Sequence, residues 1–130
     1  MWVKLAAARG ACVQWVEADL RSYQPAQDEY DLVLIAYIHF TAPDFAALLA
    51  AAASALAPGG TLLVVGHDVD NISHGYGGPQ DPGILHRADR IVSALPGLTV
   101  RRAGQARRAV SVPDGERTAI DTVVRLERPR

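Results

Sequence analysis

The fold of this chain is decided by the stretch Glu29-Tyr30-Asp31-Leu32-Val33-Leu34-Ile35-Ala36-Tyr37-Ile38-His39-Phe40. No side chain between Leu32 and Ile38 is charged, and branched aliphatic residues dominate. An apolar run of this length after an acidic turn is typical of a strand buried on both faces, as in a parallel sheet under helices. Ligands bind beyond the carboxyl ends of such strands. We therefore expect residues 37–40 to form one wall of any site.

The composition of the 130-residue chain is that of one packed domain. Hydrophobic residues make up 49% of the sequence, and the formal net charge is −1. This charge gives no general attraction to nucleic acid or to acidic membranes. No apolar run approaches the roughly 20 residues that cross a bilayer, and the single cysteine, Cys12, fits a reducing cytosol. We expect a single domain over residues 1–130 in the cytoplasm, with no membrane partner.

The segments around the central strand predict another strand and a crossover helix. Val13–Asp19 follows a helix that ends at Gly10, and we interpret it as a short strand. After the central strand, Thr41 is placed to cap a helix, and residues 45–56 carry apolar side chains at helical spacing. Residues 61–66 form a second buried run. Because a helix joins the two buried strands, we expect them to be parallel and adjacent.

The C-terminal half predicts a long loop, a helix and a hairpin. Residues 68–83 are rich in Gly, Asp and Pro without periodicity, and loops of this length are usually functional or disordered. Helical spacing resumes over residues 84–95. Residues 98–112 and 118–126 are predicted as antiparallel strands. In the last strand Asp121 and Arg125 alternate with apolar and Thr side chains, so we expect this strand to be less buried than the others.

Four features in order resemble the class I S-adenosylmethionine-dependent methyltransferases that act on small molecules. They are Glu17-Ala18-Asp19-Leu20, Tyr30-Asp31-Leu32-Val33-Leu34, Leu56-Ala57-Pro58-Gly59-Gly60-Thr61-Leu62 and the terminal hairpin. The third is the most specific, because a proline and two glycines end a helix and turn it into a buried strand at low strain. The resemblance covers nearly the whole chain. It implies an α/β, Rossmann-like sheet, mostly parallel, with helices on both faces and a C-terminal antiparallel hairpin.

The resemblance also indicates that the family's N-terminal segment is not in this sequence. Family members begin with a strand, a glycine-rich turn and a helix that hold the methionine part of the cofactor, followed by a strand whose acidic end holds the ribose. Residues 75–78, Gly-Tyr-Gly-Gly, do not replace that turn, because no helix starts directly after them. We therefore expect an N-terminally truncated domain, the C-terminal two-thirds of the fold, with weak or absent S-adenosylmethionine binding by this chain alone.

By the same resemblance, four residues border the cofactor. Asp19 resembles the acceptor for the adenine amino group, and Leu20 supplies the neighbouring backbone N–H; a solvated loop aspartate is the alternative for Asp19. Ala36 and Tyr37 resemble the positions beside the methionine end, and plain core packing is the alternative for both.

Three polar residues at the strand ends are the catalytic candidates. His39 could act as general base or orient a substrate; alternatively, a backbone carbonyl satisfies it. His67 and Asp68 could bind substrate, or they could cap the following loop. A metal site would have to draw on His74 and His86 as well, and because the histidine spacings match no ligand pattern, we expect no metal.

These features favour methyl transfer from S-adenosylmethionine to a small-molecule acceptor in the complete form of the protein. The alternative is a non-catalytic remnant of the fold that acts as an interaction or oligomerisation module. The central strand would have an open apolar edge, so we expect that residues 13–17 cover it or that two chains pair there.

A group of arginines makes the hairpin region basic. An RNA- or phosphate-binding face is one interpretation of this charge. A solvated edge that discourages aggregation between strands explains the same residues, and we favour it and expect no nucleic-acid partner. The residues are Arg101, Arg102, Arg107, Arg108 and Arg117.

Overall fold

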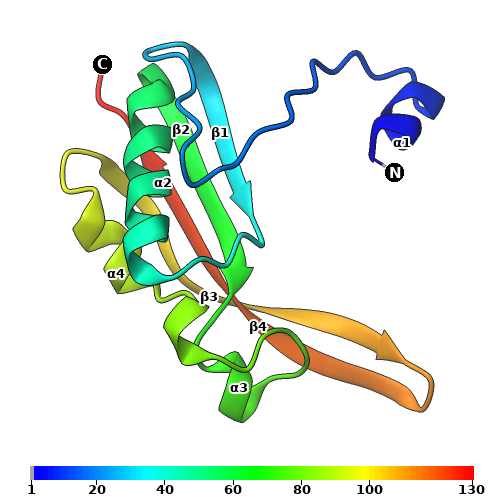
Figure 1. Ribbon diagram of the computed structural model, residues 1–130. Coiled ribbons are helices and arrows are strands. Elements are labelled where there is room, and N and C mark those ends of the chain that lie inside the picture. Colours follow the sequence, from blue (N-terminus) through cyan, green and yellow to red (C-terminus); the bar gives the residue numbers. More distant parts are fainter. Residues whose placement is uncertain (1) are drawn as a thin grey trace.

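The computed structural model describes residues 2–130, and its centre is a four-stranded sheet with two helices packed on one face (Figure 1). The elements, in chain order, are α1 (Trp2–Ala8), β1 (Tyr30–Ala36), α2 (Ala42–Ala55), β2 (Leu56–His67), α3 (Asn71–His74), a 3₁₀ turn (Pro82–Ile84), α4 (Ala88–Ala94), β3 (Thr99–Val112) and β4 (Gly115–Glu127).

The strand order is β1-β2-β4-β3. β1 runs parallel to β2, with Leu32 opposite Thr61 and Ala36 opposite Val65, and both pairings of β4 are antiparallel. The predicted adjacent parallel strands, and the hairpin on the far side of the second, are confirmed. The α/β, Rossmann-like fold class is confirmed as well.

Two details of the predicted sheet were wrong. The sheet is mixed rather than mostly parallel, because residues 2–130 contain one crossover helix between parallel strands and then a hairpin. Within that part of the chain, α2 and α4 contact each other and share one core, so the packed helices lie on one face rather than on both.

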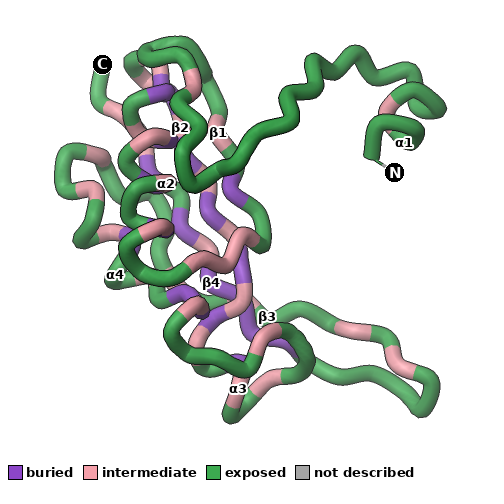
Figure 2. Tube along the Cα trace, in the orientation of Figure 1, coloured by how far each residue is buried: buried purple, intermediate pink, exposed green. Residues whose placement is uncertain are grey.

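The core lies between the sheet and these two helices. Apolar residues of α2 at helical spacing meet Ile91 of α4 and the inward-facing residues of β2 and β4 (Figure 2). Burying each such side chain is worth roughly 1.5–3 kcal/mol. The core residues at the centre of this contact are Phe45, Leu49, Ala52, Leu56, Leu62, Val64, Ile91, Val124 and Leu126.

The Pro-Gly-Gly element, residues 58–60, lies in the first residues of β2, after α2 has ended at Ala55. Gly59 has φ +80°, and a Cβ on Gly60 would lie 2.7 Å from the Tyr30 carbonyl oxygen, so the turn requires glycine to approach β1. At the other end of the helix, the expected cap was wrong. Thr41 occupies the N-cap position, but its hydroxyl lies 3.5 Å from the Asp44 carboxylate and makes no bond to the helix backbone.

The segment before β1 differs most from expectation. Residues 11–19 form no strand, and with α1 they extend away from the sheet as an exposed arm (Figures 1 and 2). Val13, Trp15 and Val16 are all about half exposed. A strand needs a neighbour to complete its hydrogen bonds, and residues 11–19 pair neither with the free edge of β1 nor with any other described strand. The predictions that Val13–Asp19 is a strand and that residues 13–17 cover the edge of β1 were therefore wrong.

The C-terminal half is more ordered than predicted. Residues 68–83 include α3 and most of the 3₁₀ turn, and the following helix is limited to α4. β3 and β4 continue beyond the sheet as a two-stranded ribbon (Figure 1). Because β4 lies between β2 and β3, its residues 119–122 are buried rather than half solvated. No helix among residues 2–130 is long and apolar enough to cross a membrane.

Candidate functional site

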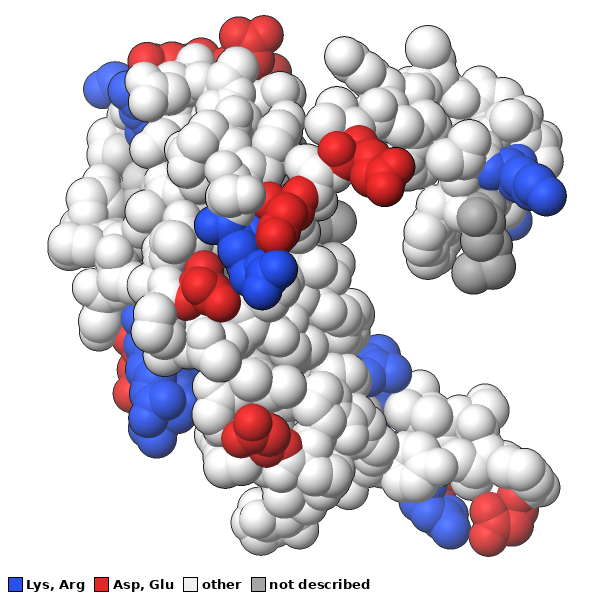
Figure 3. Space-filling view, viewed as in Figure 1, with Lys and Arg blue, Asp and Glu red and all other residues white. Residues whose placement is uncertain are grey.

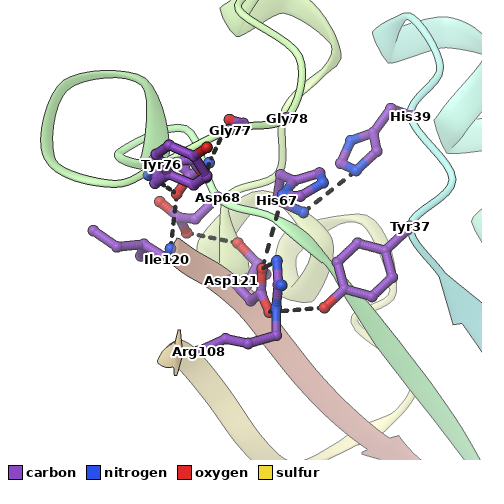
Figure 4. Close-up of polar contacts among 12 residues, drawn as sticks. Tyr37, His39, His67, Asp68, Tyr76, Gly77, Gly78, Arg108, Ile120 and Asp121 are labelled. Carbon is purple, nitrogen blue, oxygen red and sulfur yellow. Dashed lines mark hydrogen bonds and ion pairs between the residues drawn. The ribbon is translucent and has the colours of Figure 1, made fainter. Parts of the chain in front are cut away.

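The carboxyl ends of β1 and β2 meet β3 and β4 at one polar cluster. Tyr37, directly after β1, has φ +55°, a left-handed conformation that costs a residue other than glycine about 1–3 kcal/mol and is often found at functional sites. Its backbone N–H donates to the Val65 carbonyl at 2.8 Å. The ring points across β2 toward β4 (Figure 4).

A buried carboxylate from β4 lies at the centre of the cluster. Asp121 is 4% exposed and its Oδ2 accepts hydrogen bonds from the Tyr37 hydroxyl at 2.8 Å and from Arg108 Nε at 2.9 Å. The Arg108 guanidinium also lies 5.5 Å from the centre of the Tyr37 ring, within range of a cation–π contact. Burial, followed by the hydrogen bond to Asp121, raises the pKa of Tyr37. We call Tyr37, His67, Arg108 and Asp121 the Asp121 cluster.

His67 completes this cluster at the end of β2. Its Nδ1 lies 3.9 Å from Asp121 Oδ1 and is buried without a hydrogen-bond partner among the described residues. The side chain as a whole is 18% exposed, so another part of the ring reaches solvent. Burial, and next the neighbouring His39, lower the pKa of His67, while Asp121 opposes them. The ring is therefore neutral at pH 7 and able to accept a proton.

His39 lies behind His67 with both ring nitrogens occupied. Its Nδ1 is 3.0 Å from the Ile84 carbonyl, and the backbone N–H of His67 donates to its Nε2 at 3.3 Å. Nδ1 therefore carries the ring proton. This geometry matches the alternative of a histidine satisfied by a backbone carbonyl and leaves no free nitrogen for a substrate proton. Sequence reasoning placed His39 correctly but not its partners, which come from distant segments.

A third histidine extends the stack into the core. His86 packs on His39 and Phe45, with ring centres 4.5 Å apart in both cases. Burial, and next His39, lower the pKa of His86 to about 4. A Cβ on Gly66 would lie 2.4 Å from the His86 ring, so β2 can pass this stack only with glycine there. Among residues 2–130, no group of three or more His, Cys, Asp or Glu is arranged to hold a metal ion.

Asp68 is buried and fully hydrogen-bonded. Its Oδ2 accepts from the Thr122 hydroxyl at 2.6 Å, and its Oδ1 accepts from the backbone N–H of Asp70 at 2.9 Å and from Gln105 at 3.0 Å. These bonds tie the end of β2 to β3, β4 and the loop that follows. The geometry thus supports the loop-capping alternative for Asp68.

A loop held by Asn71 covers one side of His67. The Asn71 Oδ1 accepts from the backbone N–H groups of Ile120 at 2.8 Å and Tyr76 at 3.1 Å, and its Nδ2 donates to the Gly77 carbonyl at 3.0 Å. A Cβ on Gly78 would come within 3.0 Å of His67 Nδ1 (Figure 4). Sequence reasoning missed Asn71, although its place in a loop rich in glycine was a usable signal.

An apolar groove of about 530 Å³ runs along β1 beside α2. Leu20, Ala36 and Ile38 line it together, so the structure brings two of the four predicted cofactor residues to one groove. The Asp19 side chain is about half exposed, and the Arg21 guanidinium holds its carboxylate at 2.9 and 3.1 Å. The hydrogen bonds from Arg21 lower the pKa of Asp19.

The groove fits one part of S-adenosylmethionine. Its volume lies within the range of small-molecule sites, and its apolar walls suit a flat ring such as adenine. Asp19 would have to leave Arg21 to accept from the adenine amino group. In the described chain no glycine-rich turn opens a helix, so residues 2–130 lack the backbone donors expected for the methionine end.

Charges elsewhere are paired or scattered. Arg101 pairs with Glu127 at 3.0 Å and Arg117 with Asp114 at 3.4 Å. On the face shown in Figure 3, small groups of both signs are separated by uncharged surface. These pairs support the interpretation of the hairpin as a solvated edge.

Residues 2–60 match the family described as a methyltransferase domain. N-methyltransferase NodS from Bradyrhizobium japonicum WM9, solved with S-adenosyl-L-homocysteine, is 16% identical with a TM-score of 0.66, covering 97% of this chain and 59% of that chain. A putative methyltransferase from Bacillus halodurans C-125 is 11% identical with a TM-score of 0.70, covering 98% of this chain and 77% of that chain.

A third similar structure is 1,6-didemethyltoxoflavin-N1-methyltransferase from Burkholderia thailandensis, with 1,6-didemethyltoxoflavin and S-adenosylhomocysteine bound. It is 15% identical with a TM-score of 0.61, covering 99% of this chain and 56% of that chain. This chain thus spans less than two-thirds of two of the three relatives. No curated protein matches the sequence. Residues 2–60 are similar to the methyltransferase-domain family, and the chain has the fold of S-adenosylmethionine-dependent methyltransferases.

Proposed function

We propose that this chain is the acceptor-binding and catalytic part of a cytoplasmic S-adenosylmethionine-dependent methyltransferase that acts on a small molecule. The observation that carries this proposal is the position of the groove beside the Asp121 cluster. Ala36 and Ile38 line the groove, and Tyr37 between them belongs to the cluster. A cofactor in the groove and an acceptor at His67 would therefore be neighbours.

The chemistry depends mainly on position. When bound, S-adenosylmethionine supplies a methyl group on a sulfonium, and transfer to a nucleophile is an in-line displacement. The residues of this chain hold the adenine in the groove and the acceptor beside Tyr37. Neutral His67 accepts a proton where the acceptor must lose one. Among the three catalytic candidates, the geometry favours His67, because the polar atoms of His39 and Asp68 already have partners.

Affinity for the cofactor should be low in this chain alone. An intact enzyme of this kind would bind at micromolar levels, about −8 kcal/mol. Losing two or three charge-assisted hydrogen bonds costs roughly 4–8 kcal/mol. The contacts that remain at Leu20 and Ala36 leave an affinity of roughly millimolar or weaker.

The test is an NMR titration of the ¹⁵N-labelled chain with S-adenosylhomocysteine. We expect weak saturable shifts at the amides of Leu20, Ala36 and Tyr37. Ala36→Leu, which fills the groove, should abolish them, and Ala109→Leu on the exposed ribbon should not. The proposal would be contradicted if no shifts appeared at a ligand concentration 10-fold above the expected dissociation constant. It would also be contradicted if the shifts were unchanged in Ala36→Leu. A dissociation constant below about 10 µM would instead contradict the predicted weak binding.

A non-catalytic pairing module is the second candidate, favoured by the open edge of β1. Leu32 and Leu34 are 59% and 57% exposed on that strand. An exposed apolar edge is a template for another chain, so a homo-oligomer through β1 is part of this alternative. A chain that dimerises through β1 but shows no shift with S-adenosylhomocysteine would favour this candidate over the enzyme.

A further inference from the structure

We propose that Asp121 is a positioning residue that stabilises His67 once this histidine has accepted a proton, and that Arg108 limits this effect. The inference rests on the proposed methyl transfer and narrows its acceptor class. The acceptor nucleophile would be a hydroxyl or an amine that loses a proton during the reaction, rather than a group that carries none.

The first observation is the unsatisfied nitrogen of His67. Nδ1 is buried without a hydrogen-bond partner among the described residues. It lies 3.9 Å from Asp121 Oδ1, the carboxylate oxygen with which it forms a long ion pair when the ring is protonated. That oxygen otherwise receives only a long contact from Arg108 at 3.5 Å, whereas Oδ2 takes the two short bonds. A small rotation of the His67 ring would bring Nδ1–H within hydrogen-bond distance of Oδ1.

The second observation concerns the groups that face His67 from each neighbouring element. Tyr37 and His39 come from the segment after β1, with ring centres 5.1 and 5.2 Å away. β3 contributes the positive Arg108 and β4 the negative Asp121. In the loop after α3, Gly78 lies against the ring, and a Cβ there would come within 3.0 Å of His67 Nδ1. The adjacent Asp68 directs its carboxylate to Thr122 and Gln105 instead.

The transfer couples methylation of the acceptor to protonation of His67. The electron pair of the acceptor nucleophile forms a bond to the methyl carbon, and the carbon–sulfur bond breaks with its pair remaining on sulfur. The acceptor proton moves to Nε2 of His67, while Nδ1–H faces Asp121. One positive charge thus passes from the sulfonium to the imidazolium, next to a buried carboxylate that attracts it.

The experiment measures the proton affinity of His67 by NMR titration of the four histidines, each assigned with a His→Gln variant. Asp121→Asn removes the carboxylate charge and should lower the proton affinity of His67 about tenfold or more, whereas Arg108→Met should raise it. Arg107→Met, on the next residue of the same strand, is the matched control and should leave it unchanged. No cofactor or acceptor is needed.

Opposite changes in Asp121→Asn and Arg108→Met would support the inference. Changes of the same sign, or none in either variant, would overturn it. If Asp121→Asn does not fold, the Arg108→Met variant alone tests the inference, because Arg108 is half exposed and its replacement should not prevent folding. An unchanged or lower proton affinity of His67 in Arg108→Met would contradict the proposal that Arg108 limits the effect of Asp121. Failure of the chain to bind S-adenosylhomocysteine would count against the proposed function only, since the titration stands without it.

Discussion

Acidification should destabilise this protein through the buried ring of His86. The side chain is 4% exposed and packs between His39 and Phe45. Burial, then His39, lower its pKa from 6.5 to about 4. The folded protein therefore holds His86 neutral in a pH range where the unfolded chain already carries a proton there.

The sign and size of the effect follow from this difference. Because the unfolded state binds the proton first, the contribution of His86 to stability is complete above pH 6.5 and is lost as the pH falls toward 4. The loss is about 2 kcal/mol at pH 5 and approaches roughly 3 kcal/mol near pH 4. This is a large part of the roughly 5–15 kcal/mol by which a domain is stable.

Urea denaturation at a series of pH values between 7 and 4.5 measures the effect. His86→Phe keeps an aromatic ring but cannot take up a proton, so its free energy of unfolding should depend much less on pH than that of the wild type. His67, whose pKa is also lowered, leaves a smaller residual slope. The exposed His74→Gln is the control and should follow the wild type. If His86→Phe retained the full wild-type slope between pH 6.5 and 5, the assignment to His86 would be wrong.

Three further changes probe the packing, the loop and the open edge. Gly66→Ala places a Cβ 2.4 Å from the His86 ring and should lower the free energy of unfolding by about 1–3 kcal/mol. A Cβ on Gly104 meets nothing within 4 Å, so Gly104→Ala is the control and should change this free energy little. Urea denaturation of both variants measures the difference. Asn71→Ala leaves the buried N–H of Ile120 without its acceptor, so the free energy of unfolding should fall by about 1–3 kcal/mol and the Ile120 amide should exchange faster. Unchanged exchange at Ile120 would show that Asn71 does not hold the loop. Leu34→Lys places a charge on the exposed edge of β1, and in sedimentation it should dissociate any dimer formed there; a dimer that persists must use another surface.

The central crossover could be predicted from the sequence because its signals are local. An apolar run makes β1, helical spacing makes α2, and Pro-Gly-Gly, shortly after the end of α2, lies in the first residues of β2. Each of these patterns depends on neighbours in the chain, and a helix between two strands leaves few arrangements. The strand ends that these elements bring together, with Tyr37 and His67, were therefore correctly expected at one edge of the sheet. The prediction that the first strand is buried on both faces was wrong, because only Ile35 of β1 is buried and the strand lies at the edge of the sheet.

Residues 13–19 show where local signals fail. Their alternation has the period of a strand, but a strand exists only when a neighbour completes its hydrogen bonds. β1 has a free edge, but no residue of this segment pairs with it, and the segment remains an exposed arm. Likewise, His39 is a plausible base by position, and only the carbonyl of Ile84, 45 residues away, shows that its nitrogen is occupied.

The sequence by itself determined the α/β crossover and the edge of the sheet where the site lies, because hydrophobic period and turn chemistry act over a few residues. The tertiary structure alone decided the chemistry of that edge. Alternation along the last strand predicted that the strand is less buried, yet Asp121 in β4 is buried and hydrogen-bonded to Tyr37, 84 residues away. Burial and charge pairing are set by segments distant in the chain, so no pattern along one strand can reveal them.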